Sequence, residues 1–599
     1  MIETDVLIVG SGPAGASAAV MLRNYGIDTL LVTKHRWLAD GPRAHYKNQR
    51  TMEVFADIGV IDEVRRQASS LRQMGDMIFC TSLSGAELGR QPYGANRACR
   101  KSDYAVASPQ EQCDLPQHLL EPILINAAGA RGAAIRFQTE YLSHQQDESG
   151  VTVRVQDRLT GAIYEIRAKY LIGADGGNSR VARDLDLPME GRMGLAGSLS
   201  FVLKADLTRH VGHRPCYLWW IMQPGADVGG IGMGLLRMIR PWNEWQVIWG
   251  YDIDGPEPDV SPEQALRIAR RLIGDNEIEM QVEKVSKWTV NQMYATTYAK
   301  GRVFCMGDAV HRHPPSNGLG CNTSIQDAYN LCWKLAHVLQ GRASVVLLDS
   351  YDTERAPIGR RIVERANKSV ADFRPIFEAL GTAADGGSGL QRLAQPTPEG
   401  AAVRHELAAA IAFKEYEFAA HGVEFNQRYR SGAIVDPVAL DYARDADLYS
   451  QASALPGGRI PHLQLVRDGH RISSLDLVGK GRFVLLCGRN GAPWTAAAAD
   501  VTRALAPVEC HVLGPGQPIE DSYGDWARLT GLAEAGCLLV RPDGYIAWRQ
   551  ETCPAEPSVA LQQALSRILG LAPQSAPSAA RGAVAGPGHL AKLRAEGSN

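Results

Sequence analysis

The amino-acid sequence predicts an α/β fold with a doubly wound parallel sheet, a second layer made of an antiparallel sheet, and a small separate α/β domain. The first of these follows from residues 4–33, which are typical of a strand, a glycine-rich turn, a helix and a second strand. The second follows from alternating or aromatic segments between residues 198 and 253. The third follows from apolar strands that alternate with helical stretches after residue 456. At about 100–200 residues per domain, 599 residues correspond to about three or four domains.

The elements can be justified in chain order. Residues 4–9 (TDVLIV) are a short apolar strand, the following helix stops at Gly26, and residues 28–33 (DTLLVT) are the next parallel strand. A parallel strand is expected again at 302–306, followed by a long helix from about Ser324 to Leu339. We expect a loop or linker over residues 379–401, which are rich in Gly, Ala, Pro and Thr, and helix over 402–430. The expected domains are a discontinuous nucleotide-binding domain (1–185 and 285–375), a sheet domain (186–284 with parts of 70–110), a linker with helices (376–455), the small α/β domain (456–570) and a disordered tail (571–599).

Composition excludes several classes of protein. The chain is 45% hydrophobic and 21% charged, as in ordinary globular proteins, and its formal charge of −2 gives no field that would attract nucleic acid or an anionic membrane. No apolar run approaches the ~20 residues of a membrane span, and the acidic start is unlike a signal peptide. The eleven cysteines include no Cys-x-x-Cys and no zinc-ligand spacing, which favours free thiols in a reducing compartment. We therefore expect a cytoplasmic protein without metal, nucleic-acid or membrane partners.

The first chemistry-bearing motif is the run Gly10-Ser11-Gly12-Pro13-Ala14-Gly15 between the first strand and helix. Gly10 permits the tight turn, Gly12 lets the backbone approach a pyrophosphate, and Gly15 lets helix and strand pack closely. The helix N-terminus then favours the pyrophosphate anion. The acid that usually binds a ribose is missing, because the second strand ends Val32-Thr33-Lys34. A lysine there would suit a 2′-phosphate, hence NADP, but two later motifs argue against that choice.

Both later motifs follow predicted strands. The first contains Asp175 in the run GADGGNS, and the second begins Gly307-Asp308 in the run GDAVH. An aspartate at a strand end can accept hydrogen bonds from sugar-chain hydroxyls, and a Pro/Gly-rich loop running into a helix can present backbone N–H groups to an electron-rich ring. The second motif continues into such a loop, with Pro315, Gly318, Leu319, Gly320, Cys321 and Asn322.

In this order and spacing, the three motifs resemble those of single-component flavoprotein aromatic hydroxylases, and the segments PRAHYKNQRTMEVF and GDAVHRHPPSNGLGCNTSIQDAYNLCWKLA look closest to the phenol 2-monooxygenases. The resemblance covers about residues 1–570. It implies a Rossmann-like FAD-binding domain, an antiparallel-sheet substrate domain and a thioredoxin-like C-terminal domain. It also implies a reaction: hydroxylation of a phenol or chlorophenol ortho to its OH to give a catechol, with NADH or NADPH and O₂, through a C4a-hydroperoxyflavin. The same chemistry on a larger polycyclic phenol, and a non-oxygenating FAD-binding redox protein, stay open as alternatives.

The resemblance also implies roles for individual residues. Arg43 and Gln117 would flank the pyrophosphate and ribityl chain, Asp308 would bind the ribityl hydroxyls, and Asp175 would support the pyrophosphate side and the approach of the reductant. Two positions depart from the family pattern: Thr33 replaces the ribose acid, and Ala182 replaces an arginine. The residues that would hold FAD are therefore Gly10, Gly12, Pro13, Ala14, Gly15, Thr33, Lys34, Arg43, Gln117, Asp175, Gly307, Asp308, Pro315, Gly318, Leu319, Gly320, Cys321 and Asn322.

His45 is the candidate catalytic residue. It stands five residues before Arg50, where resembling phenol hydroxylases carry an aspartate, and imidazole can accept a proton near neutral pH. The alternative is a structural histidine that bonds loop backbone. His311 and His313 lack a third ligand within sequence reach, which argues against a metal. Cys487 ends the first strand of the small domain without the second cysteine of a working thioredoxin, so we expect that domain to serve packing or contacts in a homodimer or homotetramer.

Overall fold

The computed structural model describes residues 2–69, 75–92, 94–224, 234–381 and 388–571. The tail expected to be disordered lies outside these residues. The chain divides into two compact units, one formed by residues 1–341 and 351–424 and the other by residues 342–350 and 425–599. The short segment 342–350 therefore belongs to the second unit although it interrupts the first.

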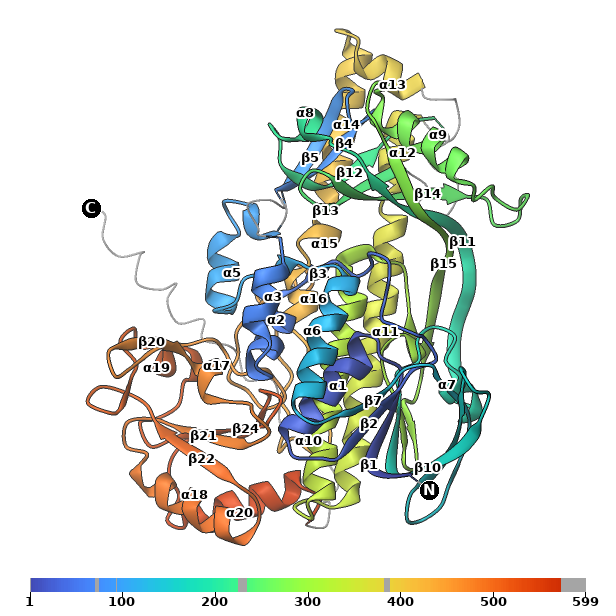
Figure 1. Ribbon diagram of the computed structural model, residues 1–599. Helices are drawn as coiled ribbons and strands as arrows, with labels where there is room; N and C mark the ends of the chain where they lie inside the picture. The colour runs from blue at the N-terminus through green and yellow to red at the C-terminus, as the bar shows by residue number, and fades with distance from the viewer. Residues whose placement is uncertain (1, 70–74, 93, 225–233, 382–387, 572–599) are drawn as a thin grey trace, which may run out of the picture. The chain divides into compact units, whose positions relative to one another are not determined.

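The first unit contains the expected parallel sheet within an eight-stranded sheet of order β16-β17-β10-β1-β2-β7 (Figure 1). β16 pairs antiparallel with β17, and β8 (Thr139–Gln146) and β9 (Val151–Asp157) extend the sheet antiparallel from β10. β1 pairs in parallel with both β2 and β10, and β10 pairs in parallel with β17. Helix α1 packs between α6 and α10. The elements are β1 (Ile2–Val9), α1 (Pro13–Asn24), β2 (Thr29–Val32), α6 (Gln117–Ala130), β7 (Ala134–Arg136), β10 (Ile163–Gly173), β16 (Ala299–Lys300), β17 (Val303–Cys305) and α10 (Leu319–Leu339).

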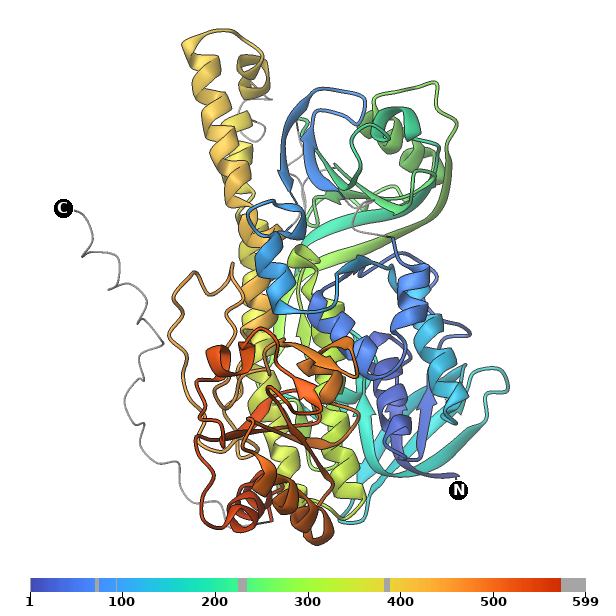
Figure 2. The same cartoon turned by 90° about the vertical axis from the view of Figure 1, so that its left-hand side faces the viewer.

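The second sheet of this unit has the order β18-β15-β11-β14-β13-β12-β4-β5. Its two longest strands, β11 and β15, pair antiparallel and run side by side from the region of the parallel sheet to the far end of the unit, as Figure 2 shows. The strands are β4 (Asp76–Cys80), β5 (Glu87–Pro92), β11 (Met189–Lys204), β12 (Cys216–Ile221), β13 (Gly234–Arg240), β14 (Glu244–Tyr251), β15 (Gln281–Ala295) and β18 (His311–Arg312).

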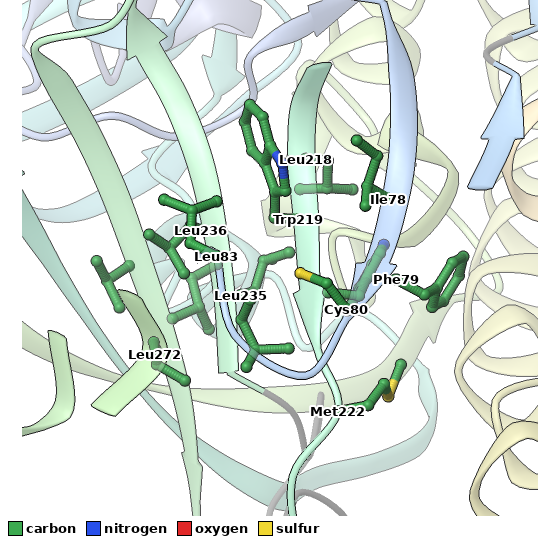
Figure 3. Close-up of a cluster of buried hydrophobic side chains, with 14 of the residues drawn as sticks. Ile78, Phe79, Cys80, Leu83, Leu218, Trp219, Met222, Leu235, Leu236 and Leu272 are labelled. Atoms are coloured by element: carbon green, nitrogen blue, oxygen red, sulfur yellow. The ribbon is translucent and has the colours of Figure 1, made fainter. Parts of the chain in front are cut away.

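Both faces of this sheet contribute to a large apolar core, since consecutive residues of β4 and β12 are buried in it; part of the core is seen in Figure 3. Trp219 on β12 and Trp245 on β14 are fully buried in it and contact one another edge to face. From sequence alone these tryptophans suited either core packing or the lining of a pocket. The structure assigns both to the core.

Helices that follow α10 complete the unit: α11 (Asp349–Ala371), α12 (Arg374–Leu380), α13 (Ser388–Leu393), α14 (Pro398–Phe413), α15 (Glu415–Phe418) and α16 (His421–Phe425). The expectation of a loop throughout 379–401 was wrong, since α13 and the start of α14 lie there. Thr397 caps α14 by accepting a hydrogen bond from the Gly400 backbone, and Pro398 occupies the first turn. The helical region also ends earlier than residue 430, at Phe425.

The second unit holds a four-stranded sheet of order β22-β21-β24-β25, in which only the β21–β22 pair is parallel. This arrangement is consistent with the expected thioredoxin-like domain. The Sγ atoms of Cys487 on β21 and Cys510 on β22 lie 3.8 Å apart, a neighbour that the search for Cys-x-x-Cys missed. The elements are β21 (Phe483–Cys487), α18 (Ala492–Ala504), β22 (Val508–Val512), β24 (Cys537–Val540), β25 (Ile546–Gln550) and α20 (Pro557–Ile568). Within the described ranges of both units, no helix has the length and apolarity that crossing a bilayer requires.

Candidate active site

The glycine-rich turn after β1 has the geometry that the motif predicts. Gly10 adopts φ +112°, and a Cβ there would lie 2.2 Å from the carbonyl oxygen of Ala174. A Cβ at Gly15 would lie 2.1 Å from the Gly10 carbonyl oxygen, so only glycine allows α1 to pack this closely on the turn. At Gly12, in contrast, a Cβ would meet nothing nearer than Glu121 at 4.0 Å. Gly12 therefore leaves open space at the start of α1, as a bound pyrophosphate requires.

The start of α1 fits an anion in a second way. Its N-cap residue, Gly12, provides no side-chain hydrogen bond to the backbone N–H groups of the first turn, and no acidic residue lies in that turn. Nearby, Arg43 is exposed and the Gln117 backbone N–H donates to its carbonyl oxygen at 2.8 Å. These two residues thus lie side by side at the start of α6. The residues present fit FAD at this end.

Thr33 and Lys34 differ in their surroundings. Thr33 is buried, and its backbone N–H donates to Arg136 while its carbonyl oxygen accepts from Thr139. Lys34 is exposed at the end of β2. Thr33 thus continues the hydrogen bonding of the sheet just beyond the end of β2. Of the two side chains, only that of Lys34 is exposed to solvent.

Asp175 holds its own loop together. Its carboxylate accepts hydrogen bonds from Ser179 Oγ at 2.5 Å and from the backbone N–H groups of Arg180 and Val181 at 2.7 and 3.2 Å. These bonds fix the start of α7 (Arg180–Asp184) at the carboxyl end of β10. The first contribution of Asp175 to the site is therefore the shape of this loop.

The Gly307-Asp308 motif is held by a buried charged network beneath it. Asp327 on α10 accepts from the Gly307 backbone N–H at 3.1 Å, contacts His311 Nε2 at 2.8 Å and pairs with Arg355 at 2.8 Å. Burial alone would raise the pKa of Asp327, but Arg355 and His311 lower it. The network aims the exposed Asp308 away from the core. An exposed carboxylate on a fixed backbone fits the binding of sugar hydroxyls.

The loop before α10 is tied to the short strand β3 (Tyr46–Lys47) by Asn322. Asn322 Nδ2 donates to the carbonyl oxygens of Tyr46 and Gly318 at 3.0 and 2.6 Å, and its Oδ1 accepts from the Asn48 backbone at 3.1 Å. Its side chain is thus used within the protein. Pro315 is exposed, Leu319 and Asn322 are buried, and Gly318, Gly320 and Cys321 lie between these extremes.

His45 lies in a buried polar cluster that joins four elements. Its Nδ1 is 3.4 Å from Asp114 Oδ1 on β6 (Cys113–Asp114), and its Nε2 is 3.1 Å from Gln246 Oε1 on β14. Gln246 Nε2 donates to Ser200 Oγ at 2.9 Å and to the Pro42 carbonyl oxygen at 3.0 Å, which fixes the amide orientation. His45 Nε2 must therefore be the protonated nitrogen of the neutral ring, leaving Nδ1 toward Asp114.

The charges of this cluster set its protonation states. Burial and the nearby Arg237 lower the pKa of His45 to about 4. Burial alone would raise the pKa of Asp114, but Arg237 on β13 and His45 lower it to about 2. Arg237 Nη2 donates to Asp114 at 2.5 Å, whereas its buried Nε has no hydrogen-bond partner among the described residues. At neutral pH the cluster thus contains a neutral imidazole, a carboxylate and a guanidinium with one unused donor.

Sequence reasoning missed Asp114, Arg237 and Gln246, which carry no local motif. Asn317 lies within the third motif, but sequence reasoning gave it no role. Its Nδ2 donates to the carbonyl oxygens of Tyr416 and Glu417 at 2.8 and 3.1 Å and so connects α15 to the loop before α10. Its φ of +62° is visible only in the structure. Over the described ranges, no group of three or more His, Cys, Asp or Glu side chains is placed to hold a metal ion.

Comparison with known proteins agrees with this site. A family model described as "FAD binding domain" matches residues 3–366, and one described as "Aromatic-ring hydroxylase, C-terminal" matches residues 453–572. The chain is 52% identical to 2,4-dichlorophenol 6-monooxygenase of Delftia acidovorans, over 95% of this chain and 99% of that protein. It is 45% identical to phenol 2-monooxygenase of a Pseudomonas species (strain EST1001), over 94% of this chain and 93% of that protein.

A solved structure agrees as well. The flavin-dependent monooxygenase PieE, in complex with FAD and substrate, superposes with a TM-score of 0.91 at 41% identity, covering 95% of this chain and 100% of that one. The residues matched by the FAD-binding family model include the three motifs described above. The chain therefore belongs to the FAD-dependent aromatic-ring hydroxylases.

Proposed function

We propose that this enzyme hydroxylates a phenol or chlorophenol at the carbon ortho to its hydroxyl group and so forms a catechol, with NADH or NADPH as the reductant. Identities of 52% and 45% to enzymes named for simple phenols support such a substrate over a larger polycyclic phenol. When bound, FAD supplies the transfer of electrons from the nicotinamide to O₂ and of one oxygen atom to the ring.

The observation that carries the proposal is the buried cluster of His45, Asp114 and Arg237. The unused Nε–H of Arg237 can donate to a phenolate oxygen, and the guanidinium stabilises its negative charge. His45 can accept the phenol proton at Nδ1, where the Asp114 carboxylate at 3.4 Å would stabilise the imidazolium. The ring of a phenolate is more reactive than the ring of the neutral phenol. These three groups are therefore suited to activating a phenol.

The remaining residues hold and orient the cofactor. We assign Gly10, Gly12 and Gly15 to the pyrophosphate, with Arg43 and Gln117 beside it, and Asp308 to the ribityl hydroxyls. The loop from Pro315 to Asn322 lies next to β3, the strand that begins at Tyr46 directly after His45. This adjacency supports a flavin ring held by that loop within reach of the phenol at His45.

The test is a screen of the purified yellow protein with a series of phenols. Consumption of NAD(P)H and O₂ that depends on the phenol and yields a stoichiometric amount of catechol is expected. NAD(P)H oxidation that yields only H₂O₂ with every phenol would overturn the proposal and favour a non-oxygenating flavoprotein. Parallel assays with NADH and NADPH identify the reductant.

We also propose that the enzyme works in the cytoplasm as a homo-oligomer. Its reductant is regenerated in the cytoplasm, which supports that location. Size-exclusion chromatography with light scattering measures the subunit number, and a monomer at micromolar concentration would contradict the second part of the proposal.

A further inference from the structure

A second polar pair lies beside residues 315–322, the loop that we assign to the flavin ring and call the flavin loop. This pair has no role in the reaction described above. Tyr46 follows His45 directly, and its hydroxyl donates to Glu424 Oε1 on α16 at 3.0 Å. The Tyr46 ring also lies against the flavin loop, because a Cβ at Gly318 would meet its Cδ1 at 2.7 Å. The Tyr46 side chain therefore contacts both the Glu424 carboxyl group and the loop that we assign to the flavin ring.

Glu424 is in an unusual state for a carboxyl group. Only 7% of the residue is exposed, and burial raises its pKa to about 8, although the Tyr46 hydrogen bond acts in the opposite direction. Its second oxygen, Oε2, is buried without a hydrogen-bond partner among the described residues. A neutral acid with Oε1 occupied by the Tyr46 hydroxyl carries its proton on Oε2. Within the described ranges of the chain that proton has no acceptor, and a buried donor without an acceptor is destabilising.

Several contacts place this pair and the His45 cluster around one region. Arg237 lies over the ring of Tyr217 at 4.9 Å. The Glu417 carbonyl oxygen accepts from Asn317 in the flavin loop. The Tyr46 ring itself is only partly buried and packs against the apolar core of the second sheet. The neighbouring residues His45 and Tyr46 thus link the two polar groups, and Tyr46 also contacts the flavin loop.

We propose that Glu424, held by Tyr46, is a specificity residue that donates a hydrogen bond to an oxygen-bearing second substituent on the phenolic ring. The inference rests on the proposed function, in which the first hydroxyl is held at His45 and Arg237. The substrate class it indicates is a phenol with a carbonyl, nitro or second hydroxyl group. Chlorine or alkyl groups at that position leave the Glu424 proton without an acceptor.

The test compares matched substrates on the holoenzyme. 4-Acetylphenol and 4-isopropylphenol have similar shapes, as do their 3-substituted isomers, but only the acetyl group offers an oxygen acceptor. The dissociation constant of each is measured from the change in the absorption spectrum of the oxidised flavin, and kcat and KM are measured by catechol formation. The electronic effect of the acetyl group is the same in every variant, so the change in the ratio between variants isolates the contact.

Four variants separate a specific contact from a structural role. Glu424→Leu and Tyr46→Phe should each reduce the preference for the acetyl member by about tenfold, mainly through the dissociation constant and KM, since they remove one buried hydrogen bond. Glu424→Gln should retain the preference, because its amide group still donates at that position. Tyr294→Phe is the matched control, since it removes another Tyr–Glu bond, of 2.8 Å to Glu190, from the paired strands β11 and β15; its ratio should not change.

The outcomes distinguish the inference from the proposed function. A ratio that stays within twofold of wild type in Glu424→Leu, with full flavin content, overturns the inference while phenol hydroxylation stands. If Glu424→Leu loses flavin or does not fold, the Tyr46→Phe ratio decides by the same criterion. A tenfold loss of the preference in Glu424→Gln, with full flavin content, also overturns the inference. Failure of the wild-type enzyme to convert any phenol to a catechol overturns the proposed function instead.

Discussion

Replacing His45 with alanine tests the proposed deprotonation most directly. General-base assistance typically contributes ~10²–10⁴-fold to a rate. The pKa of His45 is lowered to about 4 by burial and Arg237, well below the ordinary imidazole value of ~6.5, and a weaker base contributes less. We therefore expect a loss near the lower limit, about 10²-fold in oxygen transfer to an ordinary phenol, or about 2.7 kcal/mol of barrier.

The assay follows catechol and H₂O₂ formed per NAD(P)H consumed. His45→Ala should keep its flavin, form less catechol and release more H₂O₂, because reduced flavin that has reacted with O₂ then decays without transferring oxygen. The loss should shrink to less than about threefold for strongly acidic phenols, which are already phenolates and need no base. His144→Ala, which removes a half-buried histidine bonded to Tyr141, is the control. Undiminished and equally coupled rates with weakly and strongly acidic phenols would refute the reasoning and leave His45 as a structural residue.

Three further substitutions test the flavin site, the second unit and the core. Gly12→Asp should fold, since a Cβ there would lie 4.0 Å from its nearest neighbour, but it should be colourless because the added carboxylate repels the pyrophosphate. A yellow protein with full flavin content by absorbance would contradict the assignment. Cys487→Ser should leave turnover and coupling unchanged, because burial raises the pKa of this thiol and disfavours its reactive thiolate; a large loss of activity at normal flavin content would show a role in catalysis. Lys334→Met should lower the thermal midpoint, because it removes the fully buried ion pair of 2.8 Å between Lys334 and Glu354, at a cost of about 3–5 kcal/mol; scanning calorimetry that shows no decrease would contradict this prediction.

The geometry of the glycine-rich turns could be predicted because each turn is a contiguous pattern. Gly10, Gly12 and Gly15 stand within one strand–turn–helix unit, and their steric roles follow from φ values and close contacts that the spacing already implies. Asp308 is similar, since it follows a recognisable buried strand. Local patterns of this kind also predicted the parallel sheet and the positions of its strands.

The surroundings of His45 could not be predicted in the same way. Asp114 is 69 residues away in sequence and Gln246 is 201 residues away, so only the folded sheets bring them together. Which face of a strand is buried was also undecided: Trp219 and Trp245 suited a pocket or a core equally well until the sheet order was known. The start of α14 shows a different limit, because the Thr397-Pro398 cap was present but lay in a stretch whose composition indicated a loop.

The fact that residues 342–350 belong to the second unit has a consequence for protein engineering. The Ser344 backbone N–H donates to the Leu569 carbonyl oxygen at 3.0 Å, and Leu347 and Leu348 are buried. This nine-residue segment is therefore part of the folded C-terminal unit. A gene fragment that begins at residue 425 would lack it, and a chain cut at residue 424 would retain it without its partners. Grafting the C-terminal unit between related hydroxylases therefore requires two exchanged pieces, a nine-residue insert and the C-terminal stretch, taken from the same parent.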